Sequence, residues 1–288
     1  MWLADRWNDY EVLDTSGGEK LERWGDYELI RPDPQVIWNT PKKARGWKKP
    51  NGHYHRSVKG GGEWEFFDLP EQWTISYREM TFNLKPFSFK HTGLFPEQAV
   101  NWDWCADRIR NAGREISVLN LFAYTGGATL SAAAAGARVT HVDASKGMVA
   151  WAKENAGTSG LSDKPIRWLV DDCSKFVERE IRRCRTYDAI IMDPPSYGRG
   201  PKGEIWKMEE NIYPFIELCT KVLSDKPLFF LVNSYTTGLA PSVLTYMLTT
   251  ALAGRGGKVE ASEIGLPVKS TGLALPCGST GRWFIPEA

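Results

Sequence analysis

The stretch from Val118 to Gly127 constrains the fold more than any other part of the chain. An apolar run of strand length ends there in two successive glycines, and a second short apolar run, Arg138 to Val142, ends in Asp143. At the carboxyl ends of parallel strands, a glycine turn lets the backbone approach a ligand while the next helix begins beneath it. An acid at the tip of the neighbouring strand can accept hydrogen bonds from both ribose hydroxyls. This pattern predicts a nucleotide-binding site.

The spacing of the glycines separates two classes of nucleotide ligand. Dinucleotides favour G-x-G-x-x-G, which places the pyrophosphate on the amino terminus of the helix. From Ala123 the turn reads Ala-Tyr-Thr-Gly-Gly-Ala-Thr, so the first and last glycines are absent. A ligand that has ribose and adenine but no pyrophosphate fits better, and S-adenosylmethionine is the common one.

From residue 116 onwards, apolar segments of strand length alternate with segments of helical periodicity. Repeated pairs of this length predict an α/β fold, with a doubly wound, mostly parallel sheet covered by helices on both faces. The expected strands are Ile116–Phe122, Val139–Val142, Ile166–Val170, Tyr187–Met192 and Leu228–Asn233, with Lys258–Ile264 and Arg282–Ile285 closing the sheet. The expected helices cover residues 99–109, 132–135, 148–152 and 173–183, one that starts near Tyr213 with Pro214 in its first turn, and one that Pro241 opens.

Residues 1–88 differ from the rest, because they lack helical periodicity and are rich in Gly, Pro, Trp and short apolar runs. We therefore expect a small β-rich N-terminal domain over residues 1–88 and a second domain over residues 89–288. The expected N-terminal strands are Tyr27–Ile30, Glu63–Leu69, Trp73–Tyr77 and Met80–Phe87.

Within that N-terminal part, residues 41–60 carry seven Lys or Arg, two His and no acid. Two interpretations are open: a solvated loop, or a phosphate-binding surface whose aromatic rings stack on bases. The candidate RNA-binding residues in this stretch are Lys42, Lys43, Arg45, Lys48 and Lys49.

Charge and cysteine usage exclude several classes of protein. The net charge of +1 shows that the molecule as a whole is not a polycation, so any basic surface is local. Five cysteines without C-x-x-C argue against a disulfide framework and a structural zinc site, and we expect no metal. The long uncharged runs 116–137 and 227–254 are interrupted by polar residues, Gly or Pro, so we expect no membrane span. We expect a cytoplasmic protein, and the sequence leaves a homodimer open.

Acidic residues follow each of the first strands after the glycine turn: Asp143, then Asp171 and Asp172, then Asp193. Taken singly, Asp143 and Asp172 could each be a helix cap. Together with the glycine turn they indicate a ligand site, because ligands of such sheets bind outside the carboxyl ends of the strands. Asp172 suits an adenine amino group better than Asp171 does, with the backbone N–H of Cys173 donating to the ring.

The sequence Asp193-Pro194-Pro195 is the most informative motif. Two prolines directly after a strand fix an extended backbone and remove two donors, which leaves carbonyl oxygens and a carboxylate directed into one cavity. Such a site holds hydrogen-bond donors such as an amino group. It would expose the nitrogen lone pair to the methyl carbon of a sulfonium, with positioning supplying most of the rate.

The span from about Phe89 to the carboxyl terminus resembles the class I S-adenosylmethionine-dependent methyltransferases, in particular the bacterial family that modifies large-subunit ribosomal RNA. The resemblance rests on Lys90–Gln98, Asn120–Gly127, Asp143, Asp171-Asp172 and Asp193–Pro195. It implies a Rossmann-like fold, S-adenosyl-L-methionine as the cofactor and ribosomal RNA as the partner. Cofactor contacts are implied at Tyr124, Thr125, Gly126, Gly127, Asp143, Ala144, Asp172, Cys173 and Asp193, and less strongly at Phe95 and Gln98. No equally specific match covers the first 85 or so residues.

One departure from this family bears on the atom that is methylated. Members that methylate a cytosine carbon need a cysteine nucleophile after the fifth strand. This chain has Asn233 and Ser234 there, and Cys277 is the only cysteine near an expected loop on the ligand side. We therefore expect methylation of a base nitrogen, with Asp193 and the Pro194 carbonyl as acceptors. Methylation of a cytosine carbon in ribosomal RNA, or of a protein or small molecule, stays open.

Tyr197 is the expected aromatic platform for a flipped base. In amino methyltransferases an aromatic residue usually follows the second proline directly, whereas here Ser196 intervenes. Gly198–Gly203 is expected to be a flexible basic loop suited to a phosphate backbone, which adds Arg199 and Lys202 to the RNA-binding candidates. Leu275–Arg282 is expected to be a similar loop, or else a simple hairpin between the closing strands.

Two other functional classes compete with this interpretation. The missing glycines and the Asp-Pro-Pro loop disfavour a nicotinamide-dependent oxidoreductase. The intact acids disfavour a catalytically silent RNA-binding protein.

Overall fold

The computed structural model describes residues 1–57, 61–87, 89–199, 205–236 and 238–286. They form two compact units, which we describe separately. One consists of Met1, Asn101–Ile264 and Gly278–Ala288, and the other of Trp2–Val100 and Gly265–Cys277. The second unit therefore includes residues 89–100, which the sequence assigned to the domain 89–288, together with a segment close to the carboxyl terminus.

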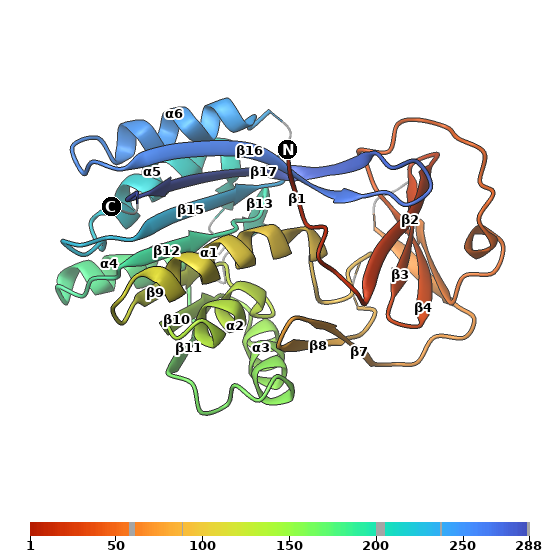
Figure 1. Ribbon diagram of the computed structural model, residues 1–288, viewed down its shortest axis with the longest axis horizontal. Helices are drawn as coiled ribbons and strands as arrows, with labels where there is room; N and C mark the ends of the chain where they lie inside the picture. The colour runs from red at the N-terminus through yellow and green to blue at the C-terminus, as the bar shows by residue number, and fades with distance from the viewer. Residues whose placement is uncertain (58–60, 88, 200–204, 237, 287–288) are drawn as a thin grey trace. The chain divides into compact units, whose positions relative to one another are not determined.

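The main sheet has eight strands in the order β1-β16-β17-β15-β12-β9-β10-β11 (Figure 1). Parallel pairing joins β15, β12, β9, β10 and β11, whereas β17 pairs antiparallel with β15. This arrangement confirms the predicted doubly wound, mostly parallel sheet. The strands are β1 (Trp2–Leu3), β9 (Ser117–Leu121), β10 (Arg138–Asp143), β11 (Ile166–Val170), β12 (Ala189–Met192), β15 (Phe229–Ser234), β16 (Lys258–Pro267) and β17 (Ala274–Phe284).

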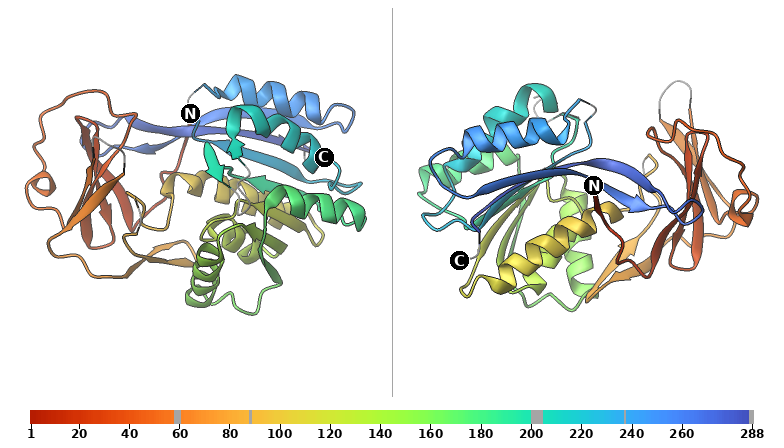
Figure 2. Two further views of the ribbon diagram at one scale, coloured as in Figure 1. Left: turned by 180° about the vertical axis from the view of Figure 1, so that it is seen from behind. Right: turned by 45° about the horizontal axis from the view of Figure 1, so that its top comes forward.

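Helices cover both faces of this sheet (Figures 1 and 2). One apolar core joins the strands to α4, α5 and α6, and the other joins them to α1 and α2. Val118 lies in one core and its neighbour Leu119 in the other, which explains why the parallel strands are apolar at nearly every position. The helices are α1 (Ala99–Asn111), α2 (Gly127–Ala134), α3 (Lys146–Thr158), α4 (Cys173–Arg182), α5 (Met208–Thr220) and α6 (Pro241–Ala251).

The predicted start of α5 is wrong. The helix begins at Met208, so Pro214 lies in its interior and not in its first turn. Met208 and Ile212 are buried, and Glu209 and Glu210 lie in the first turn, where acidic side chains complement the helix dipole. The apolar face therefore starts at Met208, about 1.7 turns before the proline that suggested the boundary.

The expected loop Leu275–Arg282 is also wrong, because these residues lie within β17. Gly278 and Gly281 suggested a turn, but both are needed for close packing. A Cβ atom on Gly278 would lie 2.7 Å from the carbonyl oxygen of Ser234, and one on Gly281 would lie 2.8 Å from Leu248 Cδ1. Here glycine permits a close approach between a strand and its neighbours.

The second unit contains a five-stranded sheet of order β2-β3-β4-β5-β6 and a separate hairpin, β7-β8. Its β4 and β5 are parallel, and the other pairs are antiparallel. The expected strands at 27–30, 63–69, 73–77 and 80–87 are present as β4, β6, β7 and β8, whereas β2, β3 and β5 were not predicted. The bounds are β2 (Tyr10–Ser16), β3 (Glu19–Trp24), β4 (Tyr27–Pro32), β5 (Gly52–Arg56), β6 (Gly62–Phe66), β7 (Trp73–Tyr77) and β8 (Met80–Leu84), with 3-10 turns η1 (Arg45–Trp47) and η2 (Pro96–Gln98).

A buried group of charges lies inside this second unit. Arg31 forms two hydrogen bonds with the Glu22 carboxylate, at 2.7 and 2.8 Å, and the Tyr10 hydroxyl donates to the same carboxylate at 2.6 Å. Lys20 lies 3.4 Å from Glu22 and 3.3 Å from Asp33. Burial opposes the ionisation of Glu22, but the charges of Arg31 and Lys20 outweigh it and lower the pKa of Glu22 to about 2.

We expect Glu22→Gln to lower the free energy of unfolding by about 3–5 kcal/mol, because Arg31 and Lys20 would keep their buried charges without the carboxylate. Urea unfolding followed by tryptophan fluorescence measures this. The exposed Glu65, which pairs with His55 on the surface, is the control; Glu65→Gln should change stability by less than about 1 kcal/mol. Because folding lowers the pKa of Glu22, the ionised carboxylate stabilises the folded state at any pH above the pKa that Glu22 has in the unfolded chain. This stabilisation is lost as the pH falls towards 2. Equal losses for both variants would contradict this account.

We expect Gly127→Ala to destabilise the first unit by roughly 1–3 kcal/mol, because the new Cβ would overlap the buried ring of Trp102. Gly147→Ala is the control, since its Cβ would meet only Ser145 Oγ at 3.8 Å. Thermal unfolding of the two variants should show a lower transition temperature for Gly127→Ala alone. An unchanged transition for both would mean that the ring of Trp102 yields.

Candidate functional site

The glycine turn connects the end of β9 to the start of α2. Phe122 and Tyr124 have positive φ angles of 55° and 49°, and Gly126, the residue before the helix, has φ of 89°. The left-handed backbone at Gly126 favours glycine, and a Cβ atom there would also lie 3.0 Å from Ala152 Cβ. The turn therefore reverses the chain tightly, and the first N–H groups of α2 follow it directly.

Asp143, the last residue of β10, ties the turn to the neighbouring strand. Its Oδ2 accepts a hydrogen bond from the Tyr124 N–H at 2.8 Å, and its Oδ1 accepts one from the Ser145 N–H at 2.8 Å. Burial raises the pKa of Asp143, and the two N–H donors oppose that rise. A carboxylate offers about four lone-pair positions, so these two bonds leave capacity for further donors such as ribose hydroxyls. Ala144, beside it, is exposed.

The turn is held from a second side by α3. The buried Asn155 amide donates to the backbone oxygen of Thr125 at 2.9 Å, and Thr125 itself is buried. Sequence inspection missed Asn155. No local motif marks it, because its partner lies thirty positions earlier in the chain.

Asp172 caps α4, where its Oδ1 accepts from the Lys175 N–H at 2.9 Å. This is the structural role considered for it at the outset, and the other carboxylate oxygen does not take part in that bond. Asp171 forms an ion pair with Arg179. Cys173 is buried, its sulfur accepts from the Phe122 N–H at 3.3 Å, and burial raises the pKa of its thiol. Cys173 thus links the start of α4 to the glycine turn.

The Asp-Pro-Pro loop leaves the carboxyl end of β12. Asp193 Oδ1 accepts a hydrogen bond from the Asn233 amide, at the carboxyl end of the adjacent β15, at 2.8 Å. The Trp206 indole donates to the Pro195 oxygen at 2.7 Å, and the Thr236 hydroxyl donates to Ser196 Oγ at 2.7 Å. The loop is therefore fixed on both sides of Pro194. Among the described residues, no donor reaches the Pro194 carbonyl oxygen.

Tyr197 lies beyond this loop, at the start of a small hairpin formed by β13 (Tyr197–Arg199) and β14 (Ile205–Lys207). Its side chain is 52% exposed. Lys202 lies outside the described residues, and Arg199 is the last residue of β13.

The parallel strands thus bring together most of the predicted site residues of the first unit. The glycine turn, Asp143, Asp172 with Cys173, and Asp193 with Pro194 all lie at the carboxyl ends of neighbouring strands. Asn233 is a further residue at this edge. The sequence analysis mentioned it only because it occupies the place where a cysteine nucleophile would stand. Its position directly after a buried strand was the available signal.

Phe95 and Gln98 belong to the second unit. Phe95 directly precedes η2 and is partly buried, and Gln98 is the last residue of η2 and is buried. The basic stretch also belongs to that unit. Lys42, Lys43, Arg45, Lys48 and Lys49 are exposed, but the stretch is less purely basic in space than in sequence. Lys42 pairs with Glu19 at 2.7 Å and lies 4.1 Å from the centre of the Trp47 ring.

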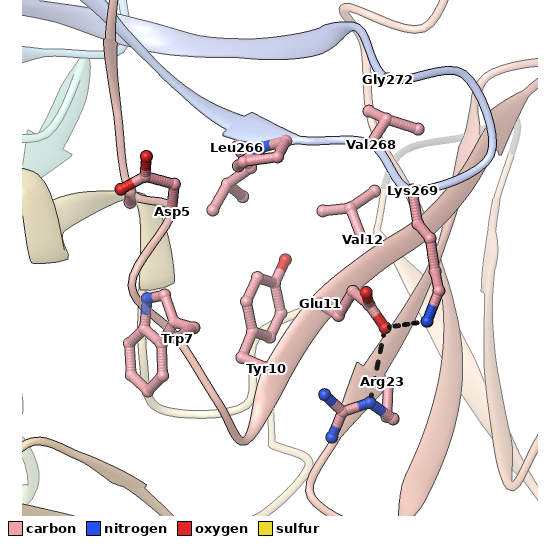
Figure 3. A pocket seen from close by; sticks show the side chains of 12 residues that line it. Asp5, Trp7, Tyr10, Glu11, Val12, Arg23, Leu266, Val268, Lys269 and Gly272 are labelled. Atoms are coloured by element: carbon pink, nitrogen blue, oxygen red, sulfur yellow. Dashed lines mark hydrogen bonds and ion pairs between the residues drawn. The ribbon is translucent and has the colours of Figure 1, made fainter.

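A pocket of about 290 Å³ also lies in the second unit (Figure 3). Trp7 and Tyr10 lie on one side of it, and Glu11 bridges Arg23 at 3.7 Å and Lys269 at 3.0 Å. None of the predicted site residues lines it. The part of the chain that the structure describes holds no group of three or more potential metal ligands. Within the same described residues, every helix is too short or too polar to cross a membrane.

Comparison with known proteins agrees with this geometry. The family model described as S-adenosylmethionine-dependent methyltransferase matches residues 35–205. A solved S-adenosylmethionine-dependent methyltransferase from Agrobacterium tumefaciens is 37% identical, with a TM-score of 0.91 over 97% of this chain and 91% of that chain. A second solved methyltransferase, in complex with S-adenosylhomocysteine, has a TM-score of 0.76 at 18% identity, over 96% of this chain and 76% of that one, which shows the shared fold.

A curated relative, the ribosomal RNA large subunit methyltransferase K/L of Shewanella frigidimarina, is 32% identical over 145 residues. That match covers 50% of this chain but only 20% of the relative, so the chain spans about a fifth of the length of that protein. The strand ends, the glycine turn and the family match agree: the chain belongs to the class I S-adenosylmethionine-dependent methyltransferases.

Proposed function

We propose that this enzyme methylates a base nitrogen in RNA, and that its substrate is large-subunit ribosomal RNA. The observation that carries the proposal is the pair of acceptors at the end of β12: the Asp193 carboxylate, held by Asn233, and the Pro194 carbonyl oxygen. Two acceptors side by side suit a group with two N–H donors, which is an amino group. The name of the Shewanella relative supports ribosomal RNA, and the exposed lysines of residues 42–49 support a polyanionic partner.

The cofactor residues follow from the same strand ends. Asp143 is the proposed acceptor for the ribose hydroxyls, and Asp172 with the Cys173 N–H is the proposed adenine contact. Tyr124 to Gly127 form the turn over which the cofactor lies, with Ala144 beside it. These groups fit a ligand with ribose and adenine, because carboxylates accept from hydroxyl and amino groups and the tight glycine turn permits close backbone approach.

S-adenosylmethionine, when bound, would supply an electrophilic methyl group on a sulfonium, with the neutral thioether as the leaving group. Asp193 and the Pro194 carbonyl would accept from the two N–H bonds and so direct the lone pair away from themselves. The proton that the nitrogen loses passes to the Asp193 carboxylate. Tyr197, half exposed at the loop, would stack on the base. Catalysis of this kind depends mainly on positioning.

The cysteines favour nitrogen over carbon. Attack on a pyrimidine ring carbon needs a reactive thiolate near the ligand. Burial raises the thiol pKa of Cys105, Cys173, Cys219 and Cys277. Cys184 precedes β12, at the opposite end of that strand from Asp193. Cys277, the alternative nucleophile suggested by the sequence, lies in a β-strand and not in a loop.

We expect Asp143→Ala to weaken S-adenosylmethionine binding about 100-fold, or ~3 kcal/mol, because the variant loses an ionised acceptor and leaves the Tyr124 and Ser145 N–H groups unpaired. Isothermal titration calorimetry measures this. Asp171→Ala is the control, since Asp171 directly follows the next strand, β11, but pairs with Arg179. In the wild type, affinity should fall as pH is lowered through the pKa of Asp143, which burial raises. Equal affinity of both variants would contradict the assignment.

We expect the wild-type enzyme to transfer labelled methyl groups to ribosomal RNA from a strain that lacks this gene, and Asp193→Ala to reduce kcat by about 100-fold or more. Nucleoside analysis should show an N-methyl base. Label in 5-methylcytosine would overturn the nitrogen assignment. Label in protein alone would overturn the RNA assignment, and equal rates for the Asp193 variant would overturn the role of the loop.

A further inference from the structure

A continuous series of hydrogen bonds connects Arg282 to Asp193 inside the first unit. Arg282 Nη2 donates to Asn101 Oδ1 at 2.7 Å, and Asn101 Nδ2 donates to Thr280 Oγ1 at 3.0 Å. The Thr280 hydroxyl donates to Asn233 Oδ1 at 2.7 Å, and Asn233 Nδ2 donates to Asp193 Oδ1 at 2.8 Å. The five residues come from α1, β15, β17 and the end of β12.

The direction of every bond in this series follows from its first member. A guanidinium only donates, so Asn101 must turn its oxygen towards Arg282 and its NH₂ group towards Thr280. Thr280, which accepts from that NH₂ group, is left to donate its own proton to Asn233 Oδ1. Asn233 must then present its NH₂ group to Asp193. The guanidinium at one end only donates and the carboxylate at the other only accepts, so both ends require the same order of bonds, with the NH₂ group of Asn233 facing Asp193.

The four supporting residues are almost completely buried: Asn101 is 3% exposed, Asn233 0%, Thr280 0% and Arg282 4%. Burying so many polar groups at the centre of an apolar sheet costs free energy unless each is paired. Apolar residues would pack β15 and β17 without that cost. Phe229, the first residue of β15, and Phe284, the last residue of β17, form such an apolar pair. The series therefore needs a reason other than packing, and it ends on the carboxylate proposed to hold the substrate.

We propose that Asn233, Thr280, Asn101 and Arg282 are positioning residues that fix the rotation of the Asp193 carboxylate for methyl transfer. This inference rests on the proposed role of Asp193. The bond from Asn233 sets which carboxylate oxygen is used inside the protein and hence how the carboxylate plane is presented to the amino group. Because reactivity depends steeply on geometry, a small rotation of this plane lowers the rate although cofactor binding is unaffected.

Thr280→Val tests this most cleanly, because valine keeps the shape of threonine but can neither donate to Asn233 nor accept from Asn101. We expect kcat for methylation of the RNA substrate to fall about 10- to 100-fold. The dissociation constant for S-adenosylmethionine and the KM for RNA should stay within about twofold. Thr280→Ser, which restores the hydroxyl, should recover most of the rate. Asn101→Ala interrupts the series one step further away and serves if Thr280→Val does not fold.

A structural role alone would give a different pattern: a lower unfolding temperature with weaker cofactor binding, and an unchanged kcat for the folded fraction. That pattern, or full activity of Thr280→Val while Asp193→Ala is inactive, would overturn the inference. An active Asp193→Ala would instead overturn the proposed function. A crystal structure of Thr280→Val gives a readout that needs no substrate. The Asp193 carboxylate and the Asn233 amide should be rotated there relative to the wild type, and an unchanged orientation of both would also overturn the inference.

Discussion

The main sheet positions the site because β15, β12, β9, β10 and β11 pair in parallel. Strands that run the same way end at the same edge, so residues that follow each strand meet although they are distant in sequence. The glycine turn after β9 therefore lies beside Asp143 at the end of β10, and Asp143 accepts a hydrogen bond from the Tyr124 N–H. The same pairing places Asn233 beside Asp193. Each proposed contact with cofactor or substrate in this unit follows from that alignment.

The fold and much of this site could be predicted because their signals are local. Buried parallel strands are apolar on both faces, so they stand out as short continuous runs, and the predicted strand Leu228–Asn233 corresponds within one residue to β15 (Phe229–Ser234), which is buried throughout. Acids that follow such runs could be assigned to one edge of the sheet by topology alone. The exception among the helices, α5, shows the limit of a local rule: Pro214 suggested a boundary that the buried Met208 and Ile212 override.

What the sequence could not show depends on contacts between distant positions. Asn101 and Arg282 lie 181 positions apart, and no local pattern indicates that they form a hydrogen bond. Gly278 and Gly281 look like turn residues until the neighbouring strand and helix show why a side chain would not fit. The basic stretch contains no acid, yet Glu19, at the start of β3, pairs with Lys42. In each case the deciding partner comes from elsewhere in the chain.

We have proposed that Asp193 and the Pro194 carbonyl hold an amino group for methylation. A crystal structure of the enzyme with S-adenosylhomocysteine and the RNA fragment that it methylates would test this. We expect an exocyclic base nitrogen about 3 Å from both acceptors, which is hydrogen-bonding distance. A ring carbon at that position, or a base bound away from Asp193, would contradict it.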